Sequence, residues 1–327
     1  MQLNDKIKIE LLHRMKWIRC SEETIAERYA EQKMRCPTHL CIGQEAVSAG
    51  VGLALRSDDY AVSTHRSHGH YLGKGGSLPA MIAEIYGKAS GCSKGKGGSM
   101  HLIDQSVGFM GSTAIVGNTI PVGAGLGLAI QLEDSESISC IFLGDATTEE
   151  GVFAESVNFC AQRKLPVLFV CENNFYSVYS PLSVRQPANR SITKMVKGMG
   201  IQSEVGDGND VLVVYTMASK AISKIRAGEG PYFLEFTTYR WREHCGPNYD
   251  NHIGYRTEKE FMEWKKKDPI PLFERKLVSE SLITASKISE MDRSIEKEVE
   301  KAFVFAEESP FPNSGEANQH VYFENIQ

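Results

Sequence analysis

The sequence predicts an α/β fold whose mostly parallel sheet has helices on both faces. The first observation is a βαβ pattern in 137–176, where two apolar runs, 138–143 and 167–171, flank a helical segment. Strands joined in this way are parallel, and the crossover is almost always right-handed. The second observation is another strand-like apolar run at 231–237, which follows a helical pattern at 211–226. The third is an ordinary globular composition, with 42% hydrophobic and 24% charged residues.

The length of 327 residues allows a sizeable core. We interpret residues 1–327 as a single domain with an N-terminal helical arm (about 1–35) and a C-terminal helical extension (about 258–327). The arm is predicted from apolar residues that recur at helical spacing in 7–31, and the extension from a mostly amphipathic pattern.

Charge and composition exclude some classes of function. The net charge of −5 gives no electrostatic reason to expect nucleic acid binding. No run approaches 18 apolar residues, so we expect no membrane span. The N-terminus lacks the apolar region of a signal peptide, and Asp5 and Glu10 argue against a transit peptide, so we expect a cytoplasmic protein. The eight cysteines are scattered without zinc spacing, as in a reduced chain.

Two polar side chains follow the two strands of the βαβ pattern. Asp145 comes after the first strand and Asn174 after the second. Parallel strands bring their carboxyl ends to one edge, where ligands of open α/β sheets bind, so we expect a common site. Their hard oxygen ligands suit Mg²⁺ holding a diphosphate better than zinc or copper. A capping box of Thr147 and Glu150 predicts a helix that begins near Thr147 and directs its amino terminus at the anion.

A second cluster of polar residues lies at 65–70, where three histidines and an arginine fall within six positions. A metal site is one interpretation, but zinc sites usually include a further ligand, and none is obvious. We favour an anion site with Arg66 as its fork, and a solvated turn is the third interpretation. His39, on a connection before the helix that opens at 43–45, is a further functional candidate.

Three glycine motifs are weaker signals. GAGLG at 123–127 lacks the spacing of a dinucleotide loop, so we interpret its glycines as small residues in a closely packed, buried helix. This disfavours an NAD-dependent Rossmann enzyme. The Gly-Asp-Gly at 206–208 is interpreted as a turn. The glycine-rich loop at 91–102 would let the backbone approach a ligand or a neighbouring chain closely.

Taken together, these segments resemble the alpha subunit of the thiamine-diphosphate-dependent first component of 2-oxo acid dehydrogenase complexes. That family includes the pyruvate, branched-chain 2-oxo acid and acetoin dehydrogenases, and the resemblance covers nearly all of 10–310. Its most specific part is Gly144-Asp145-Ala146, then 26 residues (147–172), then Asn173-Asn174, which is similar to the thiamine diphosphate signature. The other matching stretches are HLCIGQEA (39–46), HRSHGH (65–70), GKGGSMHL (95–102), AIVGNTIPVGAG (114–125), KLPVLFVCENN (164–174) and TYR (238–240).

The resemblance implies the thiamine-diphosphate-binding fold and a role for each matching residue. Asp145 and Asn174 would bind Mg²⁺ through their side chains, with the backbone carbonyl of Tyr176 as a third protein ligand. Arg66 would pair with the diphosphate. The other residues implied to contact the cofactor are His65, Ala114, Val116, Gly144, Ala146, Thr147 and His244. The residues implied to be catalytic are His244, on the loop that covers the cofactor, and His39 and His68 at the active-site entrance.

Two departures from the family pattern bear on these roles. Ala146 replaces the usual second glycine of the signature, and its methyl group fits only if φ is negative. Relatives also usually have Gly-His-Ser where this chain has Glu243-His244-Cys245, so the substrate entrance differs in shape and charge.

The implied function is decarboxylation of a 2-oxo acid, or cleavage of acetoin, and transfer of the acyl group to a lipoyl carrier on an acyltransferase. The resemblance also implies a separate beta subunit in an α₂β₂ assembly, without which the chain would be inactive. A transketolase-like or carboligating subunit is the first alternative, motivated by the altered 243–247 segment. A non-catalytic regulatory subunit is the second, although Arg66, Asp145 and Asn174 are all present.

Overall fold

The computed structural model describes residues 3–34 and 36–319, and its centre is a six-stranded sheet with the order β2-β1-β3-β4-β8-β7. All neighbouring strands pair in parallel, which confirms the predicted α/β class. The strands are β1 (Tyr60–Ser63), β2 (Phe109–Ser112), β3 (Ser139–Gly144), β4 (Val167–Asn173), β7 (Gln202–Asp207) and β8 (Tyr232–Thr237). A separate antiparallel pair consists of β5 (Tyr176–Ser177) and β6 (Ser180–Pro181).

Each face of the sheet has its own hydrophobic core. In β3, Cys140 and Phe142 point into one core, whereas Ile141 and Leu143 point into the other. Successive side chains of a strand point to opposite faces, so a strand buried on both faces must be apolar without alternation. The continuous apolar runs in the sequence are the result.

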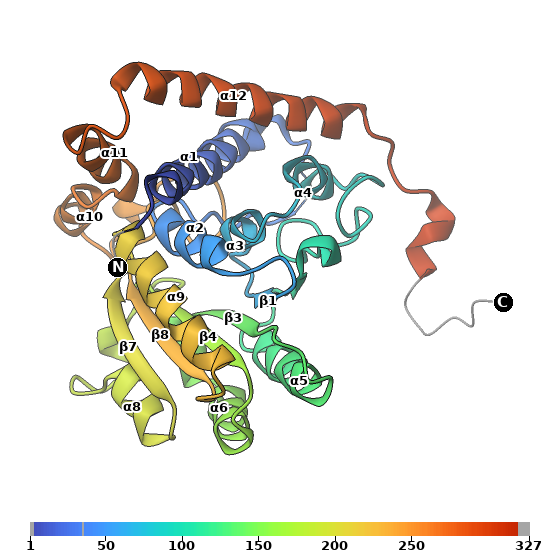
Figure 1. Ribbon diagram of the computed structural model, residues 1–327. Coiled ribbons are helices and arrows are strands. Elements are labelled where there is room, and N and C mark those ends of the chain that lie inside the picture. The colour runs from blue at the N-terminus through green and yellow to red at the C-terminus, as the bar shows by residue number, and fades with distance from the viewer. Residues whose placement is uncertain (1–2, 35, 320–327) are drawn as a thin grey trace.

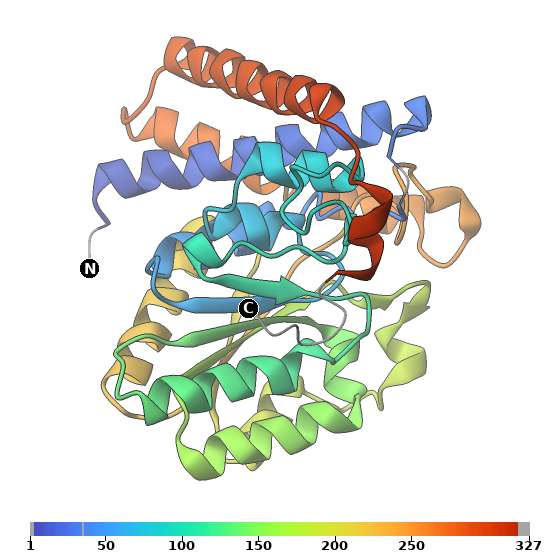
Figure 2. The same ribbon diagram turned by 90° about the vertical axis from the view of Figure 1, so that its right-hand side faces the viewer.

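Helices cover both faces of the sheet (Figures 1 and 2). The larger layer contains α1 (Asp5–Arg28), α2 (Glu45–Ala54), α3 (His68–Gly73), α4 (Leu78–Ile85), α9 (Val211–Arg226), α11 (Pro269–Ser279) and α12 (Ala285–Glu308). The opposite layer contains α5 (Thr119–Leu132), α6 (Gly151–Arg163) and α8 (Ile192–Gly198). Two further helices are α7 (Leu182–Arg185) and α10 (Glu258–Lys265). No helix of the described ranges has both the length and the apolar character that a membrane span requires.

The first and last long helices pack against each other on the outer side of the larger layer (Figure 2). An ion pair joins Arg28 of α1 to Glu300 of α12, and Lys33 lies 2.8 Å from Glu307. The expected N-terminal arm and C-terminal extension correspond to these helices. Residues 1–2, 35 and 320–327 of those two segments lie outside the described residues.

Two details of the sequence-based prediction are wrong. The helix expected near Thr147 begins at Gly151, because Asp145–Glu149 forms a 3-10 helix and Glu150 is extended at φ −73° and ψ 139°. Gly123 and Gly127 do pack closely, since added Cβ atoms would lie 2.3 Å from Ile141 and 2.5 Å from Val167. Gly125, in contrast, faces solvent, with nothing within 4 Å of an added Cβ.

The glycine-rich loop wraps around a carboxylate of the chain itself. The buried side chain of Glu84 in α4 accepts N–H groups from Ser93 (2.7 Å), Gly95 (2.9 Å), Gly97 (2.6 Å) and Gly98 (3.1 Å). These amides are therefore committed to an internal anion rather than to an external ligand.

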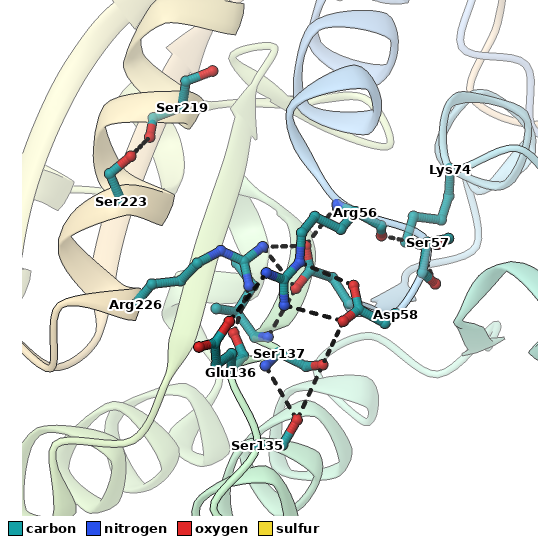
Figure 3. A network of polar contacts seen from close by, with 12 residues as sticks. Arg56, Ser57, Asp58, Lys74, Ser135, Glu136, Ser137, Ser219, Ser223 and Arg226 are labelled. Atoms are coloured by element: carbon teal, nitrogen blue, oxygen red, sulfur yellow. Dashed lines mark hydrogen bonds and ion pairs between the residues drawn. The ribbon is translucent and has the colours of Figure 1, made fainter.

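A polar network closes the amino edge of the sheet, opposite the strand ends that carry the predicted site (Figure 3). Arg226 at the end of α9 binds both carboxylate oxygens of Asp59, at 2.9 and 2.7 Å, and the carbonyl of Glu136. Arg56 pairs with Asp58 at 3.0 Å. These charges are neutralised within the network, so this edge is structural.

Candidate functional site

The carboxyl edge of the sheet carries a cavity beside the ends of β3 and β4. Asp145 begins the 3-10 helix directly after β3, and Asn174 directly follows β4. Both residues line the cavity together with Tyr176 of β5. The parallel register, which places Gly144 opposite Glu172, aligns the two strand ends. The structure thus brings the three predicted metal ligands to one place.

The carboxylate of Asp145 is buried and faces a guanidinium group from the same chain. Only 2% of Asp145 is exposed, and it forms an ion pair with Arg185 of α7. Burial raises the pKa of Asp145, and the guanidinium offsets this shift only in part. Arg185 also lies 2.5 Å from Glu149 and donates its Nε–H to the carbonyl of Ser180 at 3.1 Å. A positive group therefore already stands against the predicted metal ligand.

The amide of Asn174 is held by two hydrogen bonds. Its Oδ1 accepts the backbone N–H of Tyr176 at 3.2 Å, and its Nδ2 donates to Oε1 of Gln44 at 3.1 Å. A carbonyl oxygen has two lone pairs, so Oδ1 keeps one for a further ligand.

Arg66 is a buried guanidinium without an acidic partner. It donates to the carbonyls of Leu40 (2.6 Å) and His244 (3.2 Å), and no carboxylate in the described ranges lies within ion-pair distance. Burial, and secondly the nearby Arg240, lowers the pKa of Arg66 to about 10, so it remains charged at neutral pH. A buried charge of this kind calls for a counter-ion, and its position on the cavity wall favours an anionic ligand.

Three histidines from distant parts of the chain meet beside Arg66. The ring centroids of His39, His65 and His244 are separated by 4.7, 5.0 and 5.4 Å. Burial, and then the charge of Arg66, lowers the pKa to about 2 for His39 and about 3 for the other two. The three imidazoles are therefore neutral at neutral pH and add polar ring nitrogens, without further positive charge, to the cavity wall.

The structure does not bring His68 to this cavity. His68 is fully buried, with Nδ1 2.8 Å from Glu22 and Nε2 2.8 Å from the hydroxyl of Ser99. Glu22 also accepts the backbone N–H of Cys41 at 2.5 Å. His68 thus ties α1, α3 and the glycine-rich loop together behind the site, and a catalytic role for it stays a prediction.

The other predicted cofactor contacts line the cavity: Ala114, Val116, Gly144, Ala146 and Thr147. Ala146 is not among the described residues with positive φ, so its backbone meets the condition under which a methyl group is tolerated.

Sequence reasoning missed several residues of the site. Gln44, Thr64 and Glu172 line the cavity, and Arg185 pairs with Asp145. Gln44 and Glu172 stand inside stretches that were noticed for other residues, HLCIGQEA and CENN. Arg185 was missed because the sequence around it reads as a polar loop, whereas the structure places it at the end of the short helix α7.

These observations define a class of protein: an α/β chain that can hold an anionic ligand and a cation together at the carboxyl edge of a parallel sheet. Comparison with known proteins gives the family. The sequence model of the dehydrogenase E1 component family matches residues 13–314, so the chain belongs to that family.

Individual relatives agree with this assignment. The alpha subunit of acetoin:2,6-dichlorophenolindophenol oxidoreductase from Bacillus subtilis (strain 168) is 36% identical over 98% of this chain and 95% of its own length. The alpha subunit of the pyruvate dehydrogenase E1 component of Porphyra purpurea is 35% identical, over 93% of this chain and 89% of its own length. That of Rickettsia felis (strain ATCC VR-1525 / URRWXCal2) is 33% identical, over 93% and 92%.

The chain is thus an alpha-type subunit of a dehydrogenase E1 component, an oxidoreductase of the 2-oxo acid dehydrogenase class, and family membership implies thiamine diphosphate as cofactor and a partner beta subunit. This confirms the resemblance seen in the sequence. The relatives named above are alpha subunits of such enzymes, so the transketolase-like alternative is not supported.

Proposed function

We propose that this chain holds the diphosphate half of thiamine diphosphate through Mg²⁺, in an enzyme that decarboxylates a small 2-oxo acid or cleaves acetoin. The observation that carries this proposal is that one cavity is lined by two buried side chains of opposite charge. Arg66 supplies a buried positive charge that has no acidic partner among the described residues, and Asp145, which lines the same cavity, supplies a buried carboxylate. A diphosphate bound to a divalent cation satisfies both.

The residues present fit a magnesium ion. Asp145 and Asn174 offer side-chain oxygens and Tyr176 a backbone carbonyl, a set of hard ligands that Mg²⁺ prefers over softer donors. The guanidinium of Arg185 against Asp145 shows that a positive group is favourable at this position.

The chain's own residues position and desolvate the cofactor and present imidazole nitrogens at the cavity wall. When bound, thiamine diphosphate supplies the carbanion that attacks the substrate carbonyl and the electron sink for loss of CO₂. Arg66 neutralises diphosphate charge in a buried setting, where electrostatic interactions are strongest. The neutral rings of His39, His65 and His244 can accept or donate hydrogen bonds at the cavity wall, and we assign catalytic roles to His39 and His244.

The partner and the product carrier are part of the same proposal. We assign the chain to an α₂β₂ heterotetramer whose beta subunit completes the active site, and a lipoyl group of an acyltransferase component as acceptor. The relatives include both an acetoin oxidoreductase and a pyruvate dehydrogenase, which supports either a 2-oxo acid or acetoin as the substrate.

A calorimetric titration tests cofactor binding. The complex of this chain with a beta subunit, titrated with thiamine diphosphate in the presence of Mg²⁺, should bind with a stoichiometry near one per alpha subunit, and the complex that carries Asp145→Ala should bind far more weakly. Equal binding by both proteins would show that the metal assignment is wrong.

A reduction assay tests the reaction. The chain, co-expressed with a beta subunit, should reduce 2,6-dichlorophenolindophenol with pyruvate or with acetoin, and comparison of kcat/KM for the two identifies the substrate. Full decarboxylation by the chain alone would contradict the requirement for a beta subunit.

A further inference from the structure

Gln44 is a buried glutamine whose amide oxygen has a hydrogen-bond partner and whose amide nitrogen has none among the described residues. It lies directly before α2 with 1% of its surface exposed, on the wall of the cavity. Its Oε1 accepts the Nδ2–H of Asn174 at 3.1 Å. Its Nε2 is buried and has no hydrogen-bond partner in the described residues. An unpaired buried N–H is costly, so this end calls for a ligand.

The backbone determines which way both amides point. The N–H of Tyr176 can only donate, so the atom of Asn174 that faces it must be the carbonyl oxygen. The NH₂ end of Asn174 therefore faces Gln44 and requires an acceptor there. Gln44 must present its carbonyl to Asn174, and its own NH₂ is left without a partner among the described residues. The backbone N–H of Tyr176 thus determines the orientation of both side-chain amides.

The position of Gln44 is held firmly by its neighbours. Gly43 has φ +100°, and a Cβ there would lie 2.5 Å from the carbonyl of Tyr239, so the turn admits only glycine. Gln44 donates its own N–H to the carbonyl of Cys41 at 2.8 Å. Glu45, fully buried and paired with Arg19, accepts the N–H of Gly43 at 3.0 Å. A side chain on such a fixed turn can determine the orientation of another.

We propose that Gln44 is a positioning residue that keeps the carbonyl oxygen of Asn174 available to the metal and donates its own Nε2–H to an anionic oxygen of the cofactor. This inference rests on the proposed function, since Asn174 is its predicted metal ligand. Without Gln44, the Nδ2 of Asn174 loses its acceptor and only the N–H of Tyr176 still holds the amide, so Oδ1 is positioned less firmly toward the cation.

Two substitutions separate the two roles. Gln44→Met keeps the volume but removes both hydrogen bonds, whereas Gln44→Glu keeps an acceptor for Asn174 and removes the donor. We measure binding of Mn²⁺ by electron paramagnetic resonance and binding of thiamine diphosphate by calorimetry, both on the complex of the full chain with a beta subunit. Gln44→Met should lose about tenfold in each affinity, the loss expected for one hydrogen bond. Gln44→Glu should keep Mn²⁺ affinity and lose at least about tenfold for thiamine diphosphate, because a carboxylate repels the diphosphate.

A matched control comes from another buried amide, Asn209. It bonds the carbonyl of Lys267 at 2.8 Å and the hydroxyl of Thr238 at 2.9 Å, and it is not among the residues that line the cavity. Asn209→Leu should lower the thermal midpoint without changing either affinity, and an equal loss of affinity in Asn209→Leu would overturn the assignment to Gln44. Wild-type affinities in Gln44→Met would also overturn it while the proposed function stands. A wild-type complex with the beta subunit that binds no thiamine diphosphate would instead overturn the proposed function. If Gln44→Met does not fold, the test rests on Gln44→Glu. An unchanged affinity of Gln44→Glu for thiamine diphosphate would then overturn the inference.

Discussion

Replacing Arg185 by glutamine should tighten the binding of a divalent cation at Asp145. The guanidinium now pairs with the buried carboxylate of Asp145 and lies 2.5 Å from Glu149. A metal ion that binds Asp145 must first displace it. Arg185 lies on a helix of only four residues, so it can move without disrupting a core element. Removal of this competitor leaves the carboxylate free.

The magnitude follows from the two contacts. The pair with Glu149, whose side chain is 25% exposed, contributes little, as surface ion pairs do. The contact with Asp145 is buried, and a hydrogen bond between charged groups of this kind contributes about 2 kcal/mol. Since 1.4 kcal/mol corresponds to a factor of ten, the cation should bind roughly 30-fold more tightly to Arg185→Gln.

The assay is a titration of the full chain with Mn²⁺ alone at pH 8, followed by electron paramagnetic resonance. The pH matters because burial raises the pKa of Asp145, and without Arg185 a proton competes more strongly for the carboxylate. The gain should therefore be smaller at pH 6. Arg56→Gln is the control, since Arg56 also pairs with acidic side chains but lies at the opposite edge of the sheet (Figure 3). Unchanged or weaker Mn²⁺ binding in Arg185→Gln would refute the competition.

Three further predictions concern stability and are measured by urea denaturation. Acid should destabilise the ligand-free chain below pH 6.5, because the pKa of His65 is lowered to about 3 in the folded chain and the unfolded chain therefore binds more protons. His65→Tyr should reduce the dependence of the free energy of unfolding on pH by up to about 1.4 kcal/mol per pH unit. An unchanged dependence between pH 5 and 7 would contradict this prediction. Glu84→Gln should lower the free energy of unfolding by about 3 kcal/mol and speed hydrogen exchange of the backbone amides at 93–98, since one carbonyl cannot replace a carboxylate that accepts four N–H groups. Amide exchange as slow as in the wild type would contradict this prediction. Gly123→Ala should lower the free energy of unfolding by about 1 to 3 kcal/mol, because the added methyl group meets the core. The control Gly125→Ala should raise it by up to about 1 kcal/mol. Equal effects of the two substitutions would contradict the packing argument.

The order of polar and apolar residues along the chain was enough to predict which residues lie at the carboxyl edge of the sheet. Residues 138–143 and 167–171 are apolar without alternation because both of their faces are buried, and the helix between them makes them parallel. It follows that Asp145 and Asn174 lie at one edge, as observed. The boundary of α6 was missed because Thr147 and Glu150 match a capping box, whereas the chain here forms a 3-10 turn first.

The partners of these residues were decided only by the tertiary structure. Periodicity describes which residues share a face of one element, but a hydrogen bond between distant segments depends on how the elements pack. Gln44 and Asn174 are 130 positions apart, and Arg66 and the carbonyl of His244 are 178 apart. The sequence alone therefore determined the sheet, its ligand-binding edge and the family. Packing decided which histidines meet in the cavity, which arginine faces Asp145, and which amide orients Asn174, because each of these contacts joins segments that no local pattern relates.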